Sequence, residues 1–172
     1  MNGGAIFNRG SLTLLGTTVS GNEAFTSGGG IYNAGSLILQ ESTIFDNVAS
    51  TSGGGIYNSG TLKVTKASTV SGNASGSRGG GIFNDGGKMS LGKSNILDNY
   101  AAEHGGGVFN QSGWVSMTNS STLLRNEAGV DGGGIYSLGG TLTVSNTQVA
   151  NNYAWRNGGA IFVDGGGGPN TK

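Results

Sequence analysis

The chain has 172 residues, of which 37 are glycine, one is proline, none is cysteine and only 10% are charged. This composition excludes an ordinary helical globule, a charged disordered tail, a disulfide framework and a thiolate zinc site, and no apolar run approaches the ~20 residues of a membrane span. Nine basic residues balance nine acidic ones, which argues against nucleic acid as a partner and against membrane binding or membrane insertion by this chain.

Two or three glycines followed by an aliphatic and an aromatic residue recur along the whole chain. The copies begin at Gly3, Gly28, Gly53, Gly79, Gly105, Gly132 and Gly158, with steps of 25, 25, 26, 26, 27 and 26 residues. A repeat of this length is typical of a solenoid, in which each unit contacts only its neighbours and none buries its apolar face alone. We predict one β-solenoid domain over residues 1–164 and a glycine-rich tail over residues 165–172.

Three short patterns follow one another within each repeat, and each predicts a strand. The first is the glycine motif itself. The second alternates apolar with other residues, as at Leu37 and Leu39, and the third places an aliphatic residue three positions before an asparagine, as at Val70 and Asn73. Glycine triplets and β-branched residues disfavour helix. Three strands in about 26 residues match one coil of a parallel β-helix, so we expect an all-β fold of six to seven coils stacked at ~4.8 Å.

Asparagine recurs at two positions of the coil, and we expect each set to form a ladder at a bend. The first ladder comprises Asn33, Asn58, Asn84 and Asn110, and the second comprises Asn22, Asn47, Asn73, Asn99, Asn126 and Asn152. Asparagine tolerates left-handed backbone geometry, and its side-chain amide can bond to the coils on either side. We interpret both ladders as structural.

An aromatic residue directly follows the aliphatic residue of every glycine motif. The column comprises Phe7, Tyr32, Tyr57, Phe83, Phe109, Tyr136 and Phe162. Adjacent strand residues point to opposite faces, so either the aromatic or the aliphatic column lies inside. We favour rings that point outward, because the asparagine two positions after the aliphatic residue shares its face and bonds inward. The aromatic column would then form an exterior strip suited to lateral packing of another solenoid or to stacking against sugar rings.

Residues suited to catalysis are sparse, and we expect no enzyme activity. Asp46 and Asp98 occupy equivalent positions two coils apart, about 10 Å by the strand spacing, but their place beside the bend asparagine indicates a solvated turn. His104 falls in a loop column between Arg78 and Asp131, which we interpret as exposed loop surface. No carboxylate cluster indicates a calcium site, so we predict no catalytic residue, no metal site and no cofactor.

The pairing of Gly3-Gly4-Ala5-Ile6 with Val19-Ser20-Gly21-Asn22 resembles the repeats of chlamydial-type polymorphic outer membrane proteins and related β-helical autotransporter passengers. The resemblance extends over residues 3–163. It implies a right-handed parallel β-helix on a cell surface, commonly an adhesin. We therefore expect an extracellular or cell-surface location, and no signal sequence in this chain because Met1 and Asn2 lead directly into the first repeat.

The end coils carry no capping segment in the sequence, so we expect Gly3, Ile6, Gly158 and Ile161 to form an end-to-end interface. The predicted function is a non-enzymatic extracellular structural solenoid that self-assembles head to tail into a homopolymer. The alternative is a surface adhesin that binds a glycan or a protein receptor through the aromatic column. Remote alternatives are a polysaccharide-active β-helix and an ice-binding protein, whose required threonine array is interrupted, first at Asn95.

Overall fold

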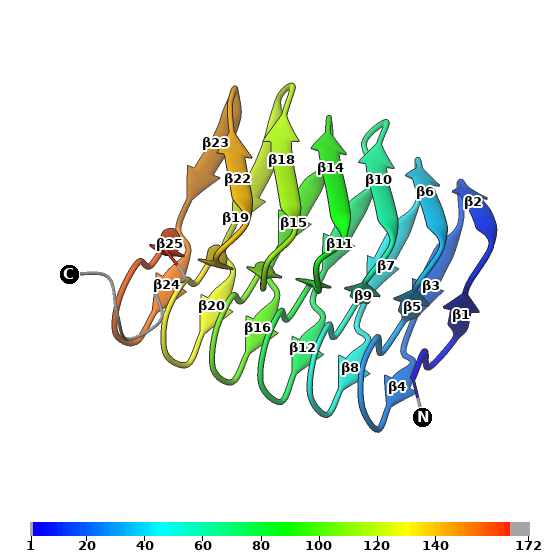
Figure 1. Cartoon of the computed structure of the whole chain (residues 1–172), viewed down its shortest axis with the longest axis horizontal. Coiled ribbons are helices and arrows are strands. Elements are labelled where there is room, and N and C mark those ends of the chain that lie inside the picture. Colours follow the sequence, from blue (N-terminus) through cyan, green and yellow to red (C-terminus); the bar gives the residue numbers. More distant parts are fainter. Residues whose placement is uncertain (1, 166–172) are drawn as a thin grey trace.

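The computed structural model describes residues 2–165, which form a single stack of coils (Figure 1). Each coil contributes strands to four sheets, one with seven strands and three with six. Every strand pairs in parallel with the equivalent strands of the coils beside it. The first and last coils therefore lie at opposite ends of the long axis of the molecule.

The strands of each sheet follow in chain order. The first sheet contains β1 (Ile6–Asn8), β5 (Ile31–Asn33), β9 (Ile56–Asn58), β13 (Ile82–Asn84), β17 (Val108–Asn110), β21 (Ile135–Leu138) and β25 (Ile161–Asp164). The second contains β2 (Ser11–Leu15), β6 (Ser36–Gln40), β10 (Thr61–Thr65), β14 (Lys88–Gly92), β18 (Trp114–Thr118) and β22 (Thr141–Val144). The third contains β3 (Thr18–Ser20), β7 (Thr43–Phe45), β11 (Thr69–Ser71), β15 (Asn95–Leu97), β19 (Ser121–Leu124) and β23 (Thr147–Ala150). The fourth contains β4 (Glu23–Ala24), β8 (Val48–Ala49), β12 (Ala74–Ser75), β16 (Tyr100–Ala101), β20 (Glu127–Ala128) and β24 (Tyr153–Ala154).

The predicted all-β solenoid of about six turns of about 26 residues is confirmed, and the three predicted strands are present in each complete turn. The fourth sheet, made of two-residue strands, is an addition that the sequence patterns do not predict. It arises because the third pattern divides in two. The strand β3 ends at Ser20, the chain bends at Gly21 and Asn22, and β4 begins at Glu23. The second asparagine ladder therefore stands at the bend between the third and fourth sheets.

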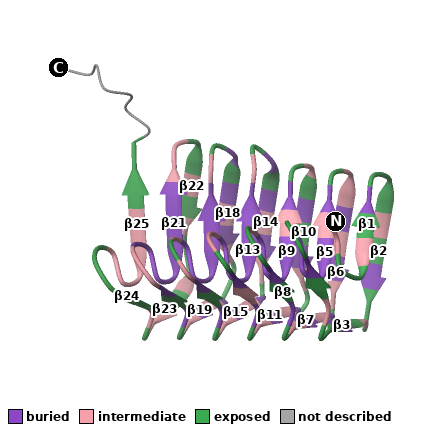
Figure 2. Ribbon diagram, turned by 90° about the horizontal axis from the view of Figure 1, so that it is seen from below, coloured by how far each residue is buried: buried purple, intermediate pink, exposed green. Residues whose placement is uncertain are grey.

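Aliphatic columns fill the inside of the coil. In β10, Leu62 and Val64 are fully buried, whereas Lys63 between them is exposed. The register places like residues on like, so that Leu62 pairs with Leu37 on one side and Met89 on the other. Figure 2 shows the buried residues as purple segments through the central coils. Burying each large aliphatic side chain contributes about 1.5–3 kcal/mol, and this burial requires the neighbouring coils.

Glycine is required at two positions of the triplet. The first glycine has a left-handed backbone, for example Gly79 with a φ of +65°. The second lies against the neighbouring coil, where a Cβ on Gly80 would overlap the backbone carbonyl of Tyr100. The triplet therefore lets adjacent coils approach backbone to backbone where the chain turns into the first sheet.

Candidate functional site

The second asparagine ladder is a continuous chain of side-chain amides, as predicted. From Asn22 to Asn152, the Nδ2 of each asparagine donates to the Oδ1 of the next at 2.9–3.0 Å. The same Oδ1 accepts the backbone N–H of the preceding asparagine at 3.0–3.1 Å. In addition, the Nδ2 of Asn73 donates to the carbonyl oxygens of Ile44 and Ser71, both at 3.0 Å. The ladder thus satisfies backbone groups that the bend removes from the sheets.

The first asparagine ladder is also present and is longer than predicted. The donations from Nδ2 to Oδ1 run through Asn8, Asn33, Asn58, Asn84 and Asn110, at 2.7–2.9 Å. The ladder continues into Ser137, whose Oγ accepts from Asn110 at 3.1 Å. Serine replaces asparagine in that copy of the glycine motif, and its hydroxyl takes the same place in the ladder.

A column of buried serines at the bend between the second and third sheets is not predicted. It comprises Ser42, Ser68, Ser94 and Ser121. The backbone N–H of Ser42 donates to the Oγ of Ser68 at 3.2 Å, and the Oγ of Ser68 donates to the carbonyl of Thr65 at 2.6 Å. Serine or threonine does precede the third pattern in every repeat, but these residues are so common in the chain that the column is hard to recognise.

The aromatic column points away from the aliphatic core, and its rings stack on one another. Successive ring centroids lie 4.7–5.3 Å apart, and the ring planes are within 9° of parallel from Phe7 to Tyr136. The exposed strip that the sequence predicts is present only in part. Phe7 is 45% exposed, but Phe83, Phe109 and Tyr136 are buried in a second apolar cluster. The prediction of a continuous exterior strip is therefore wrong for these three rings.

The loop column that precedes the glycine triplets covers the buried rings. The guanidinium of Arg78 lies 5.3 Å from the ring centroid of Phe109, and the imidazole of His104 lies 4.7 Å from that of Tyr136. Successive loops pair through single parallel bridges from Arg78 to His104 and from His104 to Asp131. The interpretation of this column as exposed loop surface is wrong for Asp131, which is only 3% exposed, whereas the side chains of Arg78 and His104 are 41% and 21% exposed.

Asp131 is the centre of a charged network that fixes these loops. Its carboxylate accepts from the guanidinium of Arg156 at 3.3 and 2.8 Å and from the backbone and side-chain amides of Asn157 at 3.0 and 2.9 Å. The Nδ1 of His104 lies 3.5 Å from the same carboxylate. Hydrogen bonds from Arg156 lower the pKa of Asp131, although desolvation opposes them. Desolvation lowers the pKa of His104, although the charge of Asp131 opposes it.

The carboxylates considered for catalysis occupy turns. Asp46 and Asp98 have left-handed backbones, with φ values of 52° and 54°. Asp98 accepts two hydrogen bonds from the guanidinium of Arg125, at 2.7 and 2.9 Å, on the exposed surface. Within residues 2–165, no three His, Asp or Glu side chains converge in a way that could hold a metal ion. In the same range, no helix has the length and apolar character to cross a membrane.

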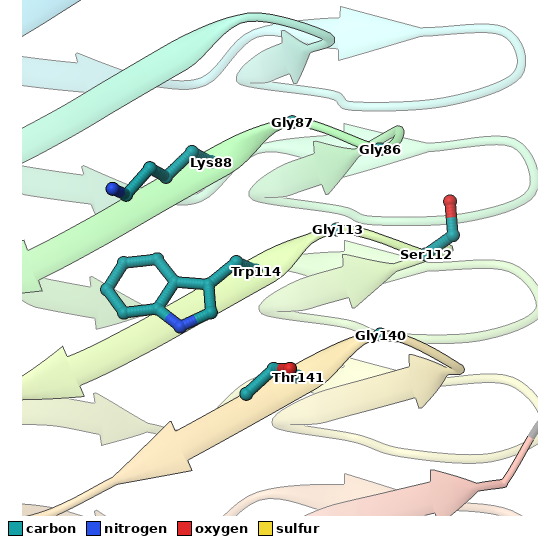
Figure 3. A pocket seen from close by; sticks show the side chains of 8 residues that line it. All are labelled: Gly86, Gly87, Lys88, Ser112, Gly113, Trp114, Gly140 and Thr141. Atoms are coloured by element: carbon teal, nitrogen blue, oxygen red, sulfur yellow. The ribbon is translucent and has the colours of Figure 1, made fainter.

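A lateral groove lies at the start of the strands of the second sheet (Figure 3). It has a volume of about 420 Å³ and is lined by Gly86, Gly87, Lys88, Ser112, Gly113, Trp114, Gly140 and Thr141. Lys88, Trp114 and Thr141 are register neighbours on β14, β18 and β22. The ammonium of Lys88 lies 5.2 Å from the centroid of the indole ring. The repeat patterns do not predict this groove, because lysine and tryptophan each occur once in this column.

Comparison with known proteins supports the predicted resemblance. Residues 41–59 match the family profile of the Chlamydia polymorphic membrane protein repeat. This segment contains both halves of the motif, with Ile44 on β7, Asn47 at the bend that follows, and a glycine triplet before Ile56. Searches of curated proteins and of solved structures gave no significant match. Residues 41–59 are therefore similar to the Chlamydia polymorphic membrane protein repeat, and they form part of a parallel β-solenoid.

Proposed function

We propose that this chain is a non-enzymatic structural module of a surface-exposed passenger, in which stacked coils form a stiff scaffold. The observation that carries this proposal is the second asparagine ladder, which crosses every coil boundary from Asn22 to Asn152. Separating two coils would break the sheet hydrogen bonds, a buried amide pair and a stacked ring pair together. Since one buried hydrogen bond contributes about 1 kcal/mol net, the joint loss resists bending of the stack.

The environment of the acidic side chains supports a non-enzymatic role. Asp98 is paired with Arg125, and Asp131 is paired with Arg156. Neither carboxylate faces a second acidic group in the geometry of a general acid and base. Solenoids with this type of repeat are generally non-enzymatic.

Two measurements test the scaffold proposal. Immunolabelling and protease treatment of intact source cells should detect the protein outside the cell. Hydrogen exchange on the purified chain should show the strands of all central coils protected as one cooperative unit. The proposal would be contradicted if the protein in intact cells resisted the protease, or if the coils exchanged hydrogen independently of one another. Turnover of a polysaccharide substrate by the purified chain would also contradict it.

End-to-end self-assembly is a second candidate, and the topology of the first sheet favours it. The strands β1 and β25 are the two outer strands of this sheet. Ile6 and Ile161 belong to the same inward column, and Gly3 and Gly158 both have left-handed backbones, with φ values of 73° and 59°. A coil of a second molecule placed against either strand would continue the sheet in the same register.

Sedimentation velocity at increasing protein concentration, with electron microscopy, tests this assembly. Ile161→Lys should abolish it, because the junction would place a charge in an apolar seam. Thr143→Lys, on the exposed side of the second sheet, is the matched control and should assemble normally. A wild-type chain that stays monomeric at every concentration would refute end-to-end assembly.

The aromatic column could also serve an adhesin that binds a glycan or a protein receptor. The buried rings of Phe83, Phe109 and Tyr136 reduce the area that such a partner could contact. The accessible part of the column consists of Phe7, Tyr32, Tyr57 and Phe162. Phe7 is the most exposed of them, so its substitution by alanine should weaken any binding through this column. Unchanged binding by Phe7→Ala would place the receptor elsewhere.

A further inference from the structure

Within residues 2–165, the lysines lie on the outer face of the second sheet and in the turns beside it. Those within residues 2–165 are Lys63 and Lys88 on the neighbouring strands β10 and β14, and Lys66 and Lys93 in the turns that follow these strands. All are exposed. Lys63 and Lys88 are offset by two residues across adjacent strands, about 8 Å by the spacing and rise of a sheet. A chain with no net charge therefore has a local basic surface.

No carboxylate of residues 2–165 lies within ion-pair distance of these lysines. The strands of the second sheet contain no Asp or Glu. Asp85, which precedes the groove, accepts a hydrogen bond from the Tyr57 hydroxyl. Glu41 follows β6 at the position equivalent to Lys66 in the adjacent coil, but the two side chains form no ion pair. The positive charge on this face is therefore open to an anionic ligand from solution.

Trp114 continues this basic face within the groove. Its indole is 37% exposed and lies beside Lys88, and Figure 3 shows the ring face-on between Lys88 and Thr141. The hydroxyls of Ser112 and Thr141 complete the polar lining. An exposed indole offers a flat apolar surface on which a pyranose ring can stack, and the hydroxyls and lysines suit the polar groups of a sugar.

We propose that this face binds a linear acidic polysaccharide, with one sugar ring on Trp114 and the carboxylate or sulfate groups of the polymer on Lys88 and Lys63. This site is separate from the scaffold role and does not depend on it. The charges on either side of Trp114 determine the direction in which the polymer would extend. A second groove on the other side of Thr141 contains the carboxylate of Asp164, which would repel an acidic polymer. An acidic polymer would therefore run from Trp114 across β14 toward Lys63. Single-stranded nucleic acid is disfavoured, because one indole and four lysines offer few stacking and phosphate contacts.

Titration calorimetry with the full chain tests this site. The probes are a heparin decasaccharide, a hyaluronan decasaccharide, uncharged dextran and a ten-nucleotide oligothymidine. At least one of the two acidic saccharides should bind, more weakly as salt increases, and dextran should not. Hyaluronan carries carboxylates alone, whereas heparin carries both carboxylates and sulfates, so binding of heparin without binding of hyaluronan would indicate that sulfate is required. Tighter binding of oligothymidine than of either saccharide, or no saccharide binding at millimolar concentration, would overturn the proposal.

Variants locate the binding. Trp114→Ala and the double substitution Lys63→Gln with Lys88→Gln should each weaken saccharide binding about tenfold or more. Trp155→Ala is the matched control, because Trp155 is 70% exposed and lies against Tyr153 outside the groove. Circular dichroism verifies that each variant is folded. In the folded variant Trp155→Phe, Trp114 is the only tryptophan, so saccharide should change its fluorescence. Unchanged affinity in both groove variants, or an unchanged fluorescence spectrum on binding, would refute this location.

Discussion

Asparagine suits the bends because one short side chain donates and accepts at once. The Oδ1 of Asn73 accepts two hydrogen bonds from Asn47, while its Nδ2 donates to Asn99 and to two backbone carbonyls. A serine lacks the second donor, and an apolar residue of similar volume makes none of these bonds. In the second ladder, the requirement is therefore for the amide group itself, whereas the first ladder accepts a serine at Ser137.

Replacing Asn73 with leucine should lower the free energy of unfolding by roughly 1–3 kcal/mol, because buried donors and acceptors lose their partners. Chemical denaturation measures the change. The same substitution at Asn22 is the control, since that residue lies at the end of the ladder and is only half-buried. Equal denaturation midpoints for wild type and Asn73→Leu would show that the ladder does not contribute to stability.

His104 is the only histidine, so it gives the stability of the fold a specific pH dependence. Desolvation lowers its pKa in the folded state, so the unfolded chain binds a proton more readily. The free energy of unfolding should therefore fall as the pH decreases from about 7 to about 5, below the ordinary imidazole pKa of about 6.5. Denaturation at several pH values measures this slope, which His104→Gln should remove. A slope that persists in His104→Gln contradicts the assignment.

Asp131 gives a second pH dependence at lower pH. Its pKa is lowered in the folded state, so its contribution to stability is complete above the unfolded value of about 3.9 and is lost as the pH falls below it. Asp131→Asn should be less stable than wild type at pH 7, and this difference should shrink below about pH 4. A constant difference from pH 7 to pH 3 would show that the charge of Asp131 has no stabilising role.

At the scale of the strand, alternation determines which side chains the coil requires. Leu91 in β14 is fully buried, whereas Leu15 at the end of β2 is 62% exposed. Both are leucines in the second sheet, so they differ chiefly in the face they occupy. The inward face supplies the cohesion of the stack, and the outward face is free to vary, as the change from Lys88 to Trp114 shows.

Leu91→Ala should destabilise the chain by about 2–5 kcal/mol, because the neighbouring coils cannot close the cavity. Leu15→Ala should change stability by less than about 0.5 kcal/mol. Thermal unfolding of the two variants makes the comparison. Similar losses for both would mean that the inward and outward faces are assigned incorrectly.

The sequence predicts the elements with a repeated pattern and fails for those formed by single residues. The glycine motif, the Leu62 and Val64 alternation and the asparagine positions recur in nearly every repeat, and each corresponds to a sheet or a ladder. The covering of Phe109 depends on the place of the Arg78 guanidinium, 5.3 Å from the ring centroid, which a periodicity does not encode. The loop-column residue of the last repeat is Asn157, and Arg156 is the residue before it. The repeat pattern therefore does not predict the hydrogen bond from Arg156 to Asp131.

At the scale of the whole molecule, the register of the coils underlies every proposal. It places each asparagine on the next, stacks the rings, and brings Lys88, Trp114 and Thr141 together from segments about 26 residues apart. A net charge of zero conceals the fact that the lysines of residues 2–165 lie on the second sheet or in the turns beside it. The stiffness of the scaffold and the lateral groove would both be lost if the coils slipped by one residue, because every side chain would change face.

Disulfide formation between introduced cysteines tests this register most directly, because the natural chain has no cysteine. Thr69 and Asn95 are register partners on β11 and β15, at about 4.8 Å, within the ~4.4–6.8 Å that a disulfide spans. Thr43 and Asn95 lie two coils apart, at about 10 Å. We predict that Thr69→Cys with Asn95→Cys forms an intramolecular disulfide on mild oxidation and that Thr43→Cys with Asn95→Cys does not. Equal cross-linking of the two pairs, or cross-linking only of the distant pair, would contradict the in-register parallel solenoid.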